Sequence, residues 1–250
     1  MQECAEPMNR AFSKAVSFST TYPPSQALGP AIHGDLNFAI DHLLGCMPNP
    51  QQLSSEERRG IIARYTAVLE GNFIYWMTGA YLSVSSDKAR SIILDNLREE
   101  VRDSHPRMLR NFALGAHSVP TDSDAIAVQR DLTKVRLFVG RLSGVRIVTM
   151  MAFFEGFIQR FMSYLAELAA GQGSVEREYT DVHGVCDVAH TKQLFDALAA
   201  EMVLDPPGPE ADLFEGVKLL GTLIQCIIDP SRIDDCHGVD RVSTSDTLAA

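Results

Sequence analysis

The chain has 250 residues, of which 46% are hydrophobic and 22% are charged, a composition typical of globular proteins and unlike that of disordered or fibrous chains. We expect a single helical domain over residues 1–250, because this length suffices for one sizeable core. The formal net charge of −10 disfavours a nucleic-acid partner, since phosphate contacts need clustered lysine and arginine. The last residues, 231–250, are charged and poor in apolar residues and predict a loose C-terminal tail.

The cysteines and the apolar segments indicate the compartment. Five cysteines form an odd set without CxxC spacing, which argues against both a disulfide framework and a zinc knuckle. No stretch approaches about 18 uninterrupted apolar residues, and the N-terminus has neither the basic start nor the apolar block of a signal peptide. We therefore expect a cytoplasmic protein that does not bind membranes.

Apolar residues recur with a helical period along nearly the whole chain. A first helical unit runs to about Cys46, and the segment 48–50, which reads PNP, then breaks the chain. Ser54 and Glu57 have the spacing of a capping box, which predicts the start of a second helix. We expect this helix to continue to about Leu82.

The next helix is predicted to begin at Ser86 and to run toward His105. Proline lacks an amide hydrogen and disfavours helical backbone in the residue before it. We therefore expect the chain to kink or restart between Asp103 and Pro106.

The longest helical region is predicted over residues 125–168, with Gly140 and Gly144 marking a bend. A further helix should end at about Val203, where a proline-rich segment follows. The last apolar helix is expected over residues 213–228. Strand-like alternation of apolar and polar residues is hardly visible, so the chain is predicted to be all-α.

The most specific motif lies on the helix that ends near Val203. Residues 183–190 read HGVCDVAH, so His183, Asp187 and His190 occupy positions i, i+4 and i+7. On an α-helix these positions fall within about 60° of one another, and both imidazoles and the carboxylate therefore face one space. These side chains are all able to bind metal.

Two acids outside the motif lie in apolar surroundings. Glu155 follows a run of apolar residues, and Glu70 ends another. Burying an acid is costly unless it is paired or bound to metal. For either acid a structural salt bridge is an alternative, and a lone histidine such as His105 is more commonly a core or surface residue than a ligand. Together with the motif they predict one metal-binding core over about residues 60–200, since each buried charge needs a partner.

The ligand types indicate which metal the site would take. Three carboxylates and three imidazoles suit a pair of first-row ions such as iron or manganese better than a closed structural zinc site. Helical bundles hold such dinuclear sites with side chains that project inward from facing helices. Cys186 lies inside the motif but about 100° around the helix from its neighbours, and we interpret it as a packing residue.

In these motifs the chain resembles the heme-oxygenase-like diiron oxidases and oxygenases, which are related in fold to heme oxygenase and to the thiaminase-like TenA proteins. The resemblance covers about residues 60–200 and follows the order Glu70, the run NLREE at 96–100, His105, Glu155 and the HxxxDxxH motif. It implies an all-α, heme-oxygenase-like helical bundle with a dinuclear metal site between core helices. The implied metal ligands and catalytic residues are Glu70, His105, Glu155, His183, Asp187 and His190. Asp95, Glu99 or Glu100 could add the further carboxylate that some members use.

The resemblance also implies two Fe2+ ions and dioxygen as co-substrate. It predicts a non-heme diiron oxidase or oxygenase that acts on a small amino acid or amine in natural-product biosynthesis, by N-oxygenation, desaturation, ring closure or C–C cleavage. An external electron donor and a homodimer are compatible with it. Arg141, Arg146 and Arg160 are candidates for binding a substrate carboxylate.

Several alternatives remain open from the sequence. A fatty-acid oxidative decarboxylase of the same family is one, although no long apolar channel can be inferred. A heme oxygenase would need one axial histidine, for which His33 or His42 could serve, and would leave the acids unexplained. A TenA-like hydrolase would need a nucleophilic cysteine and would leave HxxxDxxH unexplained. A helical binding module without enzymatic activity is the last alternative.

Overall fold

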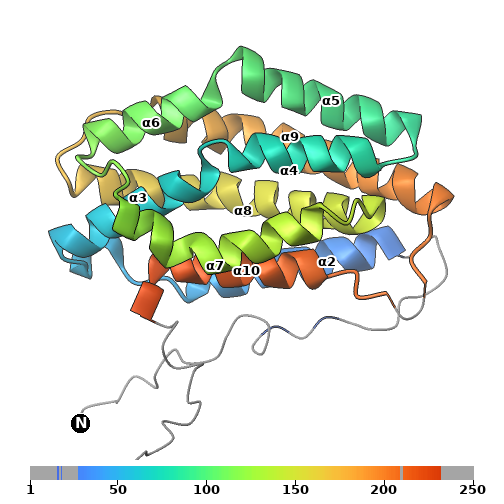
Figure 1. The fold of residues 1–250 in the computed structure, drawn as a ribbon, viewed down its shortest axis with the longest axis horizontal. Coiled ribbons are helices and arrows are strands. Elements are labelled where there is room, and N and C mark those ends of the chain that lie inside the picture. Colours follow the sequence, from blue (N-terminus) through green and yellow to red (C-terminus); the bar gives the residue numbers. More distant parts are fainter. Residues whose placement is uncertain (1–15, 17, 19–27, 209–210, 232–250) are drawn as a thin grey trace, which may run out of the picture.

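A computed structural model describes residues 16, 18, 28–208 and 211–231. All regular structure in these residues is helical (Figure 1), which confirms the all-α prediction. The elements are α2 (Leu28–Gly45), the short 3-10 helix η1 (Pro50–Gln52), α3 (Ser55–Leu69), α4 (Asn72–Ser83), α5 (Asp87–Arg102), α6 (His105–Gly115), α7 (Asp122–Val139), α8 (Gly144–Ala170), α9 (Glu178–Leu204) and α10 (Glu215–Ile228). Among these helices, none combines the length and the apolar character needed to cross a bilayer. The predicted tail lies outside the described residues except for Ser231.

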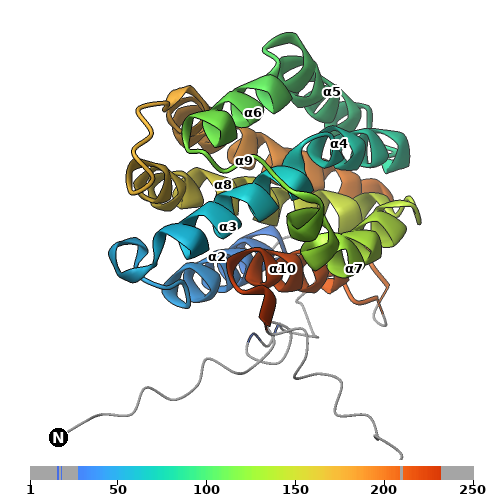
Figure 2. The same ribbon diagram turned by 60° about the vertical axis from the view of Figure 1, so that its left-hand side comes forward.

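Helix α8 forms the centre of the bundle. It packs against α9, α10, α4, α2 and α3, and α5 and α6 lie on one side of it while α2 and α10 lie on the other in both views (Figures 1 and 2). Its apolar side chains, among them Met151, Phe153 and Phe157, are buried around the whole helix. Glu155 lies in the middle of this apolar helix and is only 2% exposed. The fold is therefore built around a helix that carries a buried acid.

Two helix starts follow the sequence as predicted. The Ser54 hydroxyl accepts a hydrogen bond from the Glu57 amide at 3.2 Å, and the Glu57 carboxylate accepts one from the Ser54 amide at 2.7 Å. Ser86 caps α5 by accepting a hydrogen bond from the Ala89 amide at 3.3 Å. Each cap satisfies amide groups that the first turn of a helix leaves without partners.

The helix predicted to run to Leu82 is in fact two helices. It breaks at Gly71, whose φ of 88° lies in the left-handed region that favours glycine. Helix α3 ends at Leu69 and α4 begins at Asn72, so Glu70 is a cap residue and does not lie in the middle of a helix. An isolated glycine inside an apolar run is tolerated in many helices, which is why the sequence did not reveal this break.

The region predicted as one bent helix over 125–168 is also divided. Helix α7 ends at Val139, and Leu142 in the following turn has a φ of 53°. The two glycines therefore flank a complete chain reversal rather than a bend. The break removes the single helix that was expected to connect Arg141 with Glu155.

The predicted restart before Pro106 is confirmed. Helix α5 ends at Arg102, and Ser104 adopts a left-handed backbone with a φ of 56°. His105 is the first residue of α6, and Pro106 lies in the first turn, where the missing amide hydrogen costs nothing. This tight connection brings the start of α6 next to the end of α5.

Candidate metal centre

The HxxxDxxH motif lies on α9, which packs along α8 and α5. Its three side chains, those of His183, Asp187 and His190, are all buried, with exposures of 5%, 1% and 4%. They are divided between two groups of side chains that could each hold a metal ion. In both groups, the atoms able to bind a metal lie within 4.8 Å of one another.

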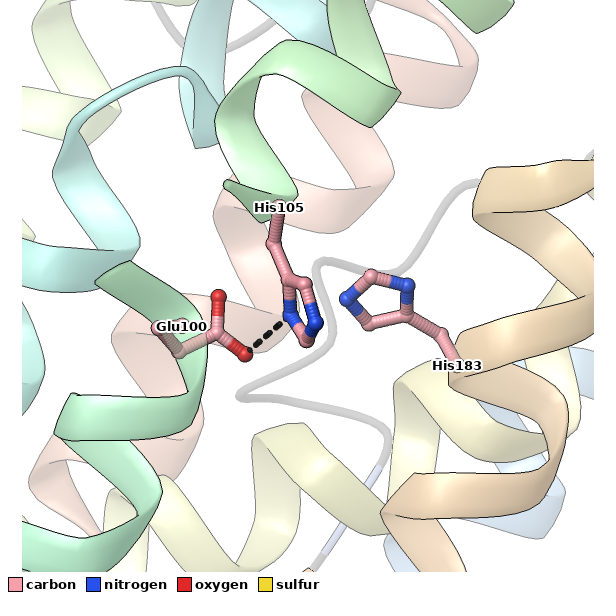
Figure 3. A group of neighbouring side chains, drawn as sticks. All are labelled: Glu100, His105 and His183. Atoms are coloured by element: carbon pink, nitrogen blue, oxygen red, sulfur yellow. Dashed lines mark hydrogen bonds and ion pairs between the residues drawn. The ribbon is translucent and has the colours of Figure 1, made fainter. Parts of the chain in front are cut away.

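The first group consists of Glu100, His105 and His183, which come from α5, α6 and α9. Figure 3 shows the side chains of His105 and His183 pointing toward each other, with Glu100 reaching His105 from α5. His105 donates a hydrogen bond from Nδ1 to Oε1 of Glu100 at 2.8 Å. The centroids of the two imidazole rings are 4.6 Å apart. The group therefore contains one carboxylate and two imidazoles at the end of the α5–α6 connection.

The second group consists of Glu155 on α8 with Asp187 and His190 on α9. Nδ1 of His190 lies 3.7 Å from Oδ1 of Asp187 and 4.0 Å from Oε2 of Glu155. Nδ1 of His190 and Oδ2 of Asp187 are both buried, and neither has a hydrogen-bond partner among the described residues. Buried polar atoms without partners are rare in folded proteins. A cation bound between these atoms would satisfy them, so the donor set fits a metal ion.

Burial changes the protonation of the centre. It raises the pKa values of Glu155 and Asp187 well above their usual range, and the neighbouring charges of Asp187 and Glu100, respectively, raise them further. Burial also lowers the pKa of His183 to about 4. The metal-free centre therefore favours protonated acids and a neutral His183, and binding of a cation would displace protons from the acids.

Glu70 belongs to neither group. Its carboxylate forms an ion pair with Arg110, and its side chain is 29% exposed. However, the adjacent Leu69 and the nearby Phe73 line the cavity at the metal groups. A role of Glu70 as a metal ligand stays a prediction.

The structure distinguishes the three further carboxylates on α5. Glu100 joins the first group, Glu99 accepts a hydrogen bond from His190 at 2.9 Å, and Asp95 pairs with Arg98 on the surface. A sequence signal for this choice exists, because the buried residues of α5 follow a helical stripe that includes Glu100. The stripe consists of Ala89, Ile93, Asn96 and Glu100.

A cavity lies against both groups and is lined by Glu100, His105, Glu155, His183 and Asp187. Its remaining walls are mainly apolar and come from Leu69, Phe73, Ile74, Pro106, Leu109, Ile158 and Tyr179. The cavity has a volume of about 20 Å³, which is room for about one water-sized molecule in reach of ligands of both groups. A larger molecule would enter only if side chains of the lining moved.

Tyr179 connects the cavity wall to the core. Its hydroxyl forms a hydrogen bond of 2.9 Å with that of Tyr65, and its carbonyl accepts a hydrogen bond of 2.8 Å from Nδ1 of His183. Burial raises the pKa of Tyr179 well above its usual value. The side chain of Tyr179 therefore stays a neutral phenol, while its backbone carbonyl holds the ring of His183 in place.

The arginines considered for a substrate carboxylate have other partners. Arg141 and Arg146 both form ion pairs with Glu215 on α10, and Arg160 pairs with Asp41 on α2. None of the three is among the residues that line the cavity at the metal groups. These arginines therefore form ion pairs that connect neighbouring parts of the bundle.

Cys186 is half-buried and has a free thiol whose pKa is raised by burial. It belongs to neither metal group. These observations agree with its interpretation as a packing residue.

Comparison with known proteins gives one family. The family model described as iron-containing redox enzyme matches residues 62–221, which is more than half of the chain. The match begins in α3, ends in α10 and includes every residue of both groups. No curated protein and no solved structure matches the chain at a significant level.

Proposed function

The chain belongs to the family of iron-containing redox enzymes, and on this basis we propose that it is a non-heme diiron oxidase or oxygenase that uses dioxygen. Within this family, one structural observation supports the proposal of a dinuclear centre. Two buried groups of three nitrogen and oxygen ligands adjoin one cavity and share the helix α9. One axial histidine would suffice for a heme, and a heme would leave the other five side chains without a role.

Each group would hold one iron ion. Glu100, His105 and His183 would bind the first ion, and Glu155, Asp187 and His190 the second. A pair of ferrous ions bound there would supply the electrons that reduce dioxygen. Three protein ligands for each ion leave coordination positions for dioxygen or a substrate group.

The chain itself contributes control of protons and water. Glu155 and Asp187, whose raised pKa values favour the protonated form without metal, would release protons when the ions bind. Leu69, Phe73 and Ile158 line the cavity with apolar surface, which would keep water away from a reactive oxidant.

Glu70 would complete the ligand set as a seventh protein ligand in this proposal. It lies at the end of α3, beside the cavity-lining Leu69. To reach an ion its carboxylate must leave Arg110, a contact of partly exposed groups that contributes only about 0.2–1 kcal/mol. A metal–carboxylate bond would offset this cost.

We propose a small amine or amino acid as the substrate. Among the described residues, the cavity lining offers no lysine or arginine to a substrate carboxylate, and its five acidic and histidine side chains are all proposed metal ligands, so the lining itself favours a substrate group that needs no such cation, such as an amine. Oxidation of such a substrate would suit a step in natural-product biosynthesis, with an external donor returning electrons to the centre. A fatty-acid oxidative decarboxylase is the alternative that the substrate experiment must decide.

The experiment is anaerobic loading of the protein with Fe(II), followed by metal analysis and exposure to dioxygen. We expect a stoichiometry of two ions per chain, as in helical bundles that hold dinuclear carboxylate sites. Dioxygen consumption should accelerate with a small amine or amino acid. Acceleration by fatty acids alone would replace the substrate class. Absence of iron binding, or of oxygen consumption with every candidate, would overturn the proposed function.

A further inference from the structure

The two ring nitrogens of His190 lie in different surroundings. Nε2 is 2.9 Å from Oε2 of Glu99, whereas Nδ1 is buried without a hydrogen-bond partner. Nδ1 is also the nitrogen nearest to the second group, at 3.7 Å from Asp187 and 4.0 Å from Glu155. Glu99 therefore holds the ring of His190 at Nε2, and Nδ1 lies toward the candidate metal position.

Glu99 itself belongs to neither metal group, and its side chain is 43% exposed. It precedes Glu100 on α5, and adjacent residues of a helix point about 100° apart. On α5, Glu100 therefore lies in the first group, whereas Glu99 contacts His190 from the solvent side. One turn of α5 therefore provides a member of the first group and a hydrogen-bond partner for a member of the second.

We propose that Glu99 is a positioning residue for the second metal ion. An ionised carboxylate only accepts hydrogen bonds, so its contact requires the proton of His190 to reside on Nε2. Nδ1 then has a free lone pair directed toward Asp187 and Glu155. Metal-binding histidines commonly donate their second ring N–H to such a partner, which fixes both tautomer and orientation.

The other two imidazoles show that this contact is distinctive. His183 donates from Nδ1 to the backbone carbonyl of Tyr179, and His105 donates to Glu100, which is itself a member of the first group. Among the three histidines of the two groups, His190 alone has its hydrogen-bond partner on a side chain outside both groups. The support of His190 can therefore be removed without removing a proposed ligand or altering the backbone.

A simple ion pair is the competing explanation. In that case Glu99 would stabilise a positively charged His190, which would oppose metal binding because a ligating imidazole must be neutral. Removal of Glu99 would then strengthen metal binding. The positioning role predicts the opposite change, so the direction of the effect separates the two explanations.

The test uses the full-length protein with two substitutions, Glu99→Gln and Glu99→Leu. The glutamine keeps an oxygen that can accept the Nε2 hydrogen, whereas leucine removes the acceptor. We expect Glu99→Leu to weaken binding of one of the two ions by about 10–100-fold, and Glu99→Gln to retain most of the affinity. Anaerobic titration with Fe(II) and absorption spectroscopy with Co(II) measure the two sites.

Asp95→Leu is the matched control. Asp95 lies one turn earlier on α5, is exposed and, within the described part of the chain, pairs with Arg98 alone, so this substitution changes the net charge equally and leaves His190 untouched. We expect unchanged affinities for both ions. Thermal melting of each variant establishes that the fold is intact.

A second readout needs no metal. Nitrogen NMR of the metal-free protein should show His190 protonated at Nε2 in the wild type and in Glu99→Gln, and a mixture of tautomers in Glu99→Leu. An unchanged tautomer, or unchanged or stronger metal binding by Glu99→Leu, would overturn the positioning role. The affinity prediction rests on the proposed function, but the tautomer does not. A wild-type protein that binds no iron would therefore refute the proposed function while the NMR result still decides the role of Glu99.

Discussion

The two metal groups share one helix but are built in different ways. Glu155, Asp187 and His190 come from two long helices that pack along each other, so their positions follow from helix register alone. The first group takes its ligands from α5, α6 and α9, and it depends on the left-handed residue Ser104 that separates α5 from α6. Helix register can be deduced from a sequence, whereas the geometry of such a connection cannot.

The groups also differ in how their polar atoms are satisfied. In the first group the hydrogen bond of 2.8 Å between His105 and Glu100 gives both side chains a partner. In the second group, Asp187 and His190 each retain a buried polar atom without one. Because unsatisfied buried groups cost about 1–3 kcal/mol each, we expect the metal-free protein to carry most of its strain in the second group.

The largest effect should follow replacement of Asp187 by asparagine. The substitution keeps the shape of the side chain but removes a buried acid, so we expect loss of the second ion and a decrease in oxygen consumption of more than about 100-fold. At neutral pH the metal-free variant should be more stable than the metal-free wild type by about 1–3 kcal/mol, because a neutral amide replaces a carboxyl whose ionisation is disfavoured by burial. Metal analysis and denaturant unfolding measure the two changes.

His183→Ala is the companion variant for the first group. It should lose the first ion and retain the second, without the gain in metal-free stability. If both variants lost both ions, the groups would form one cooperative site and the comparison between them would fail.

Much of this architecture could be predicted from the sequence. The helical period gave the bundle, and the HxxxDxxH spacing together with the apolar run before Glu155 predicted all residues of the second group. Glu100 remained one of three candidates because, although the buried stripe of α5 includes it, the position of His105 relative to that stripe depends on the break before Pro106. Glu70 was expected inside a helix because Gly71 gave no clear sign of a left-handed backbone. In both cases the missing information concerned the direction of the chain between helices.

A buried acid outside the two metal groups, Glu201, allows the cost of unsatisfied groups to be measured. Glu201 is fully buried but accepts hydrogen bonds of 2.8 Å from the amides of Ser85 and Ser86 at the start of α5. Replacing it by glutamine weakens these charge-assisted bonds, and we expect a loss of about 1.5–3 kcal/mol in unfolding free energy. The number of bound ions should not change. A stabilising effect of Glu201→Gln would show that burial alone, rather than the lack of partners, determines the cost of these acids.

The pH dependence of stability should report the second group. The folded-state pKa values of Glu155 and Asp187 are raised well above 4.5 and 3.8, so these acids favour folding at low pH, and that contribution is lost as pH rises through the folded-state values. His183 acts in the opposite direction, because its folded-state pKa of about 4 lies below the ordinary 6.5 and its protonation destabilises the fold only below pH 6.5. Above pH 6.5 the two acids, rather than His183, therefore determine how the stability of the fold changes with pH.

Thermal melting with and without Fe(II) between about pH 6.5 and 8.5 tests this expectation. Fe(II) should raise the melting temperature, and this increase should widen by several degrees as the pH rises. The reason is that fewer protons then compete with the ions for the two carboxylates. The widening should be much reduced in Asp187→Asn, which has lost one of the acids. An equal widening in that variant would assign the pH dependence to other groups.

The smallest effect concerns Glu70, whose place at the edge of the centre differs from that of both groups. Its ion pair with Arg110 involves partly exposed side chains and should contribute about 0.2–1 kcal/mol. If Glu70 must leave this pair to bind iron, Arg110→Ala should strengthen iron binding by at most about five-fold, and Glu70→Gln should weaken it.

Arg98→Ala, which removes an exposed arginine paired with Asp95, controls for the change in net charge. Equal effects of the two arginine substitutions would indicate long-range electrostatics alone. Unchanged binding in Glu70→Gln would remove Glu70 from the ligand set and leave the six residues of the two groups as the complete centre.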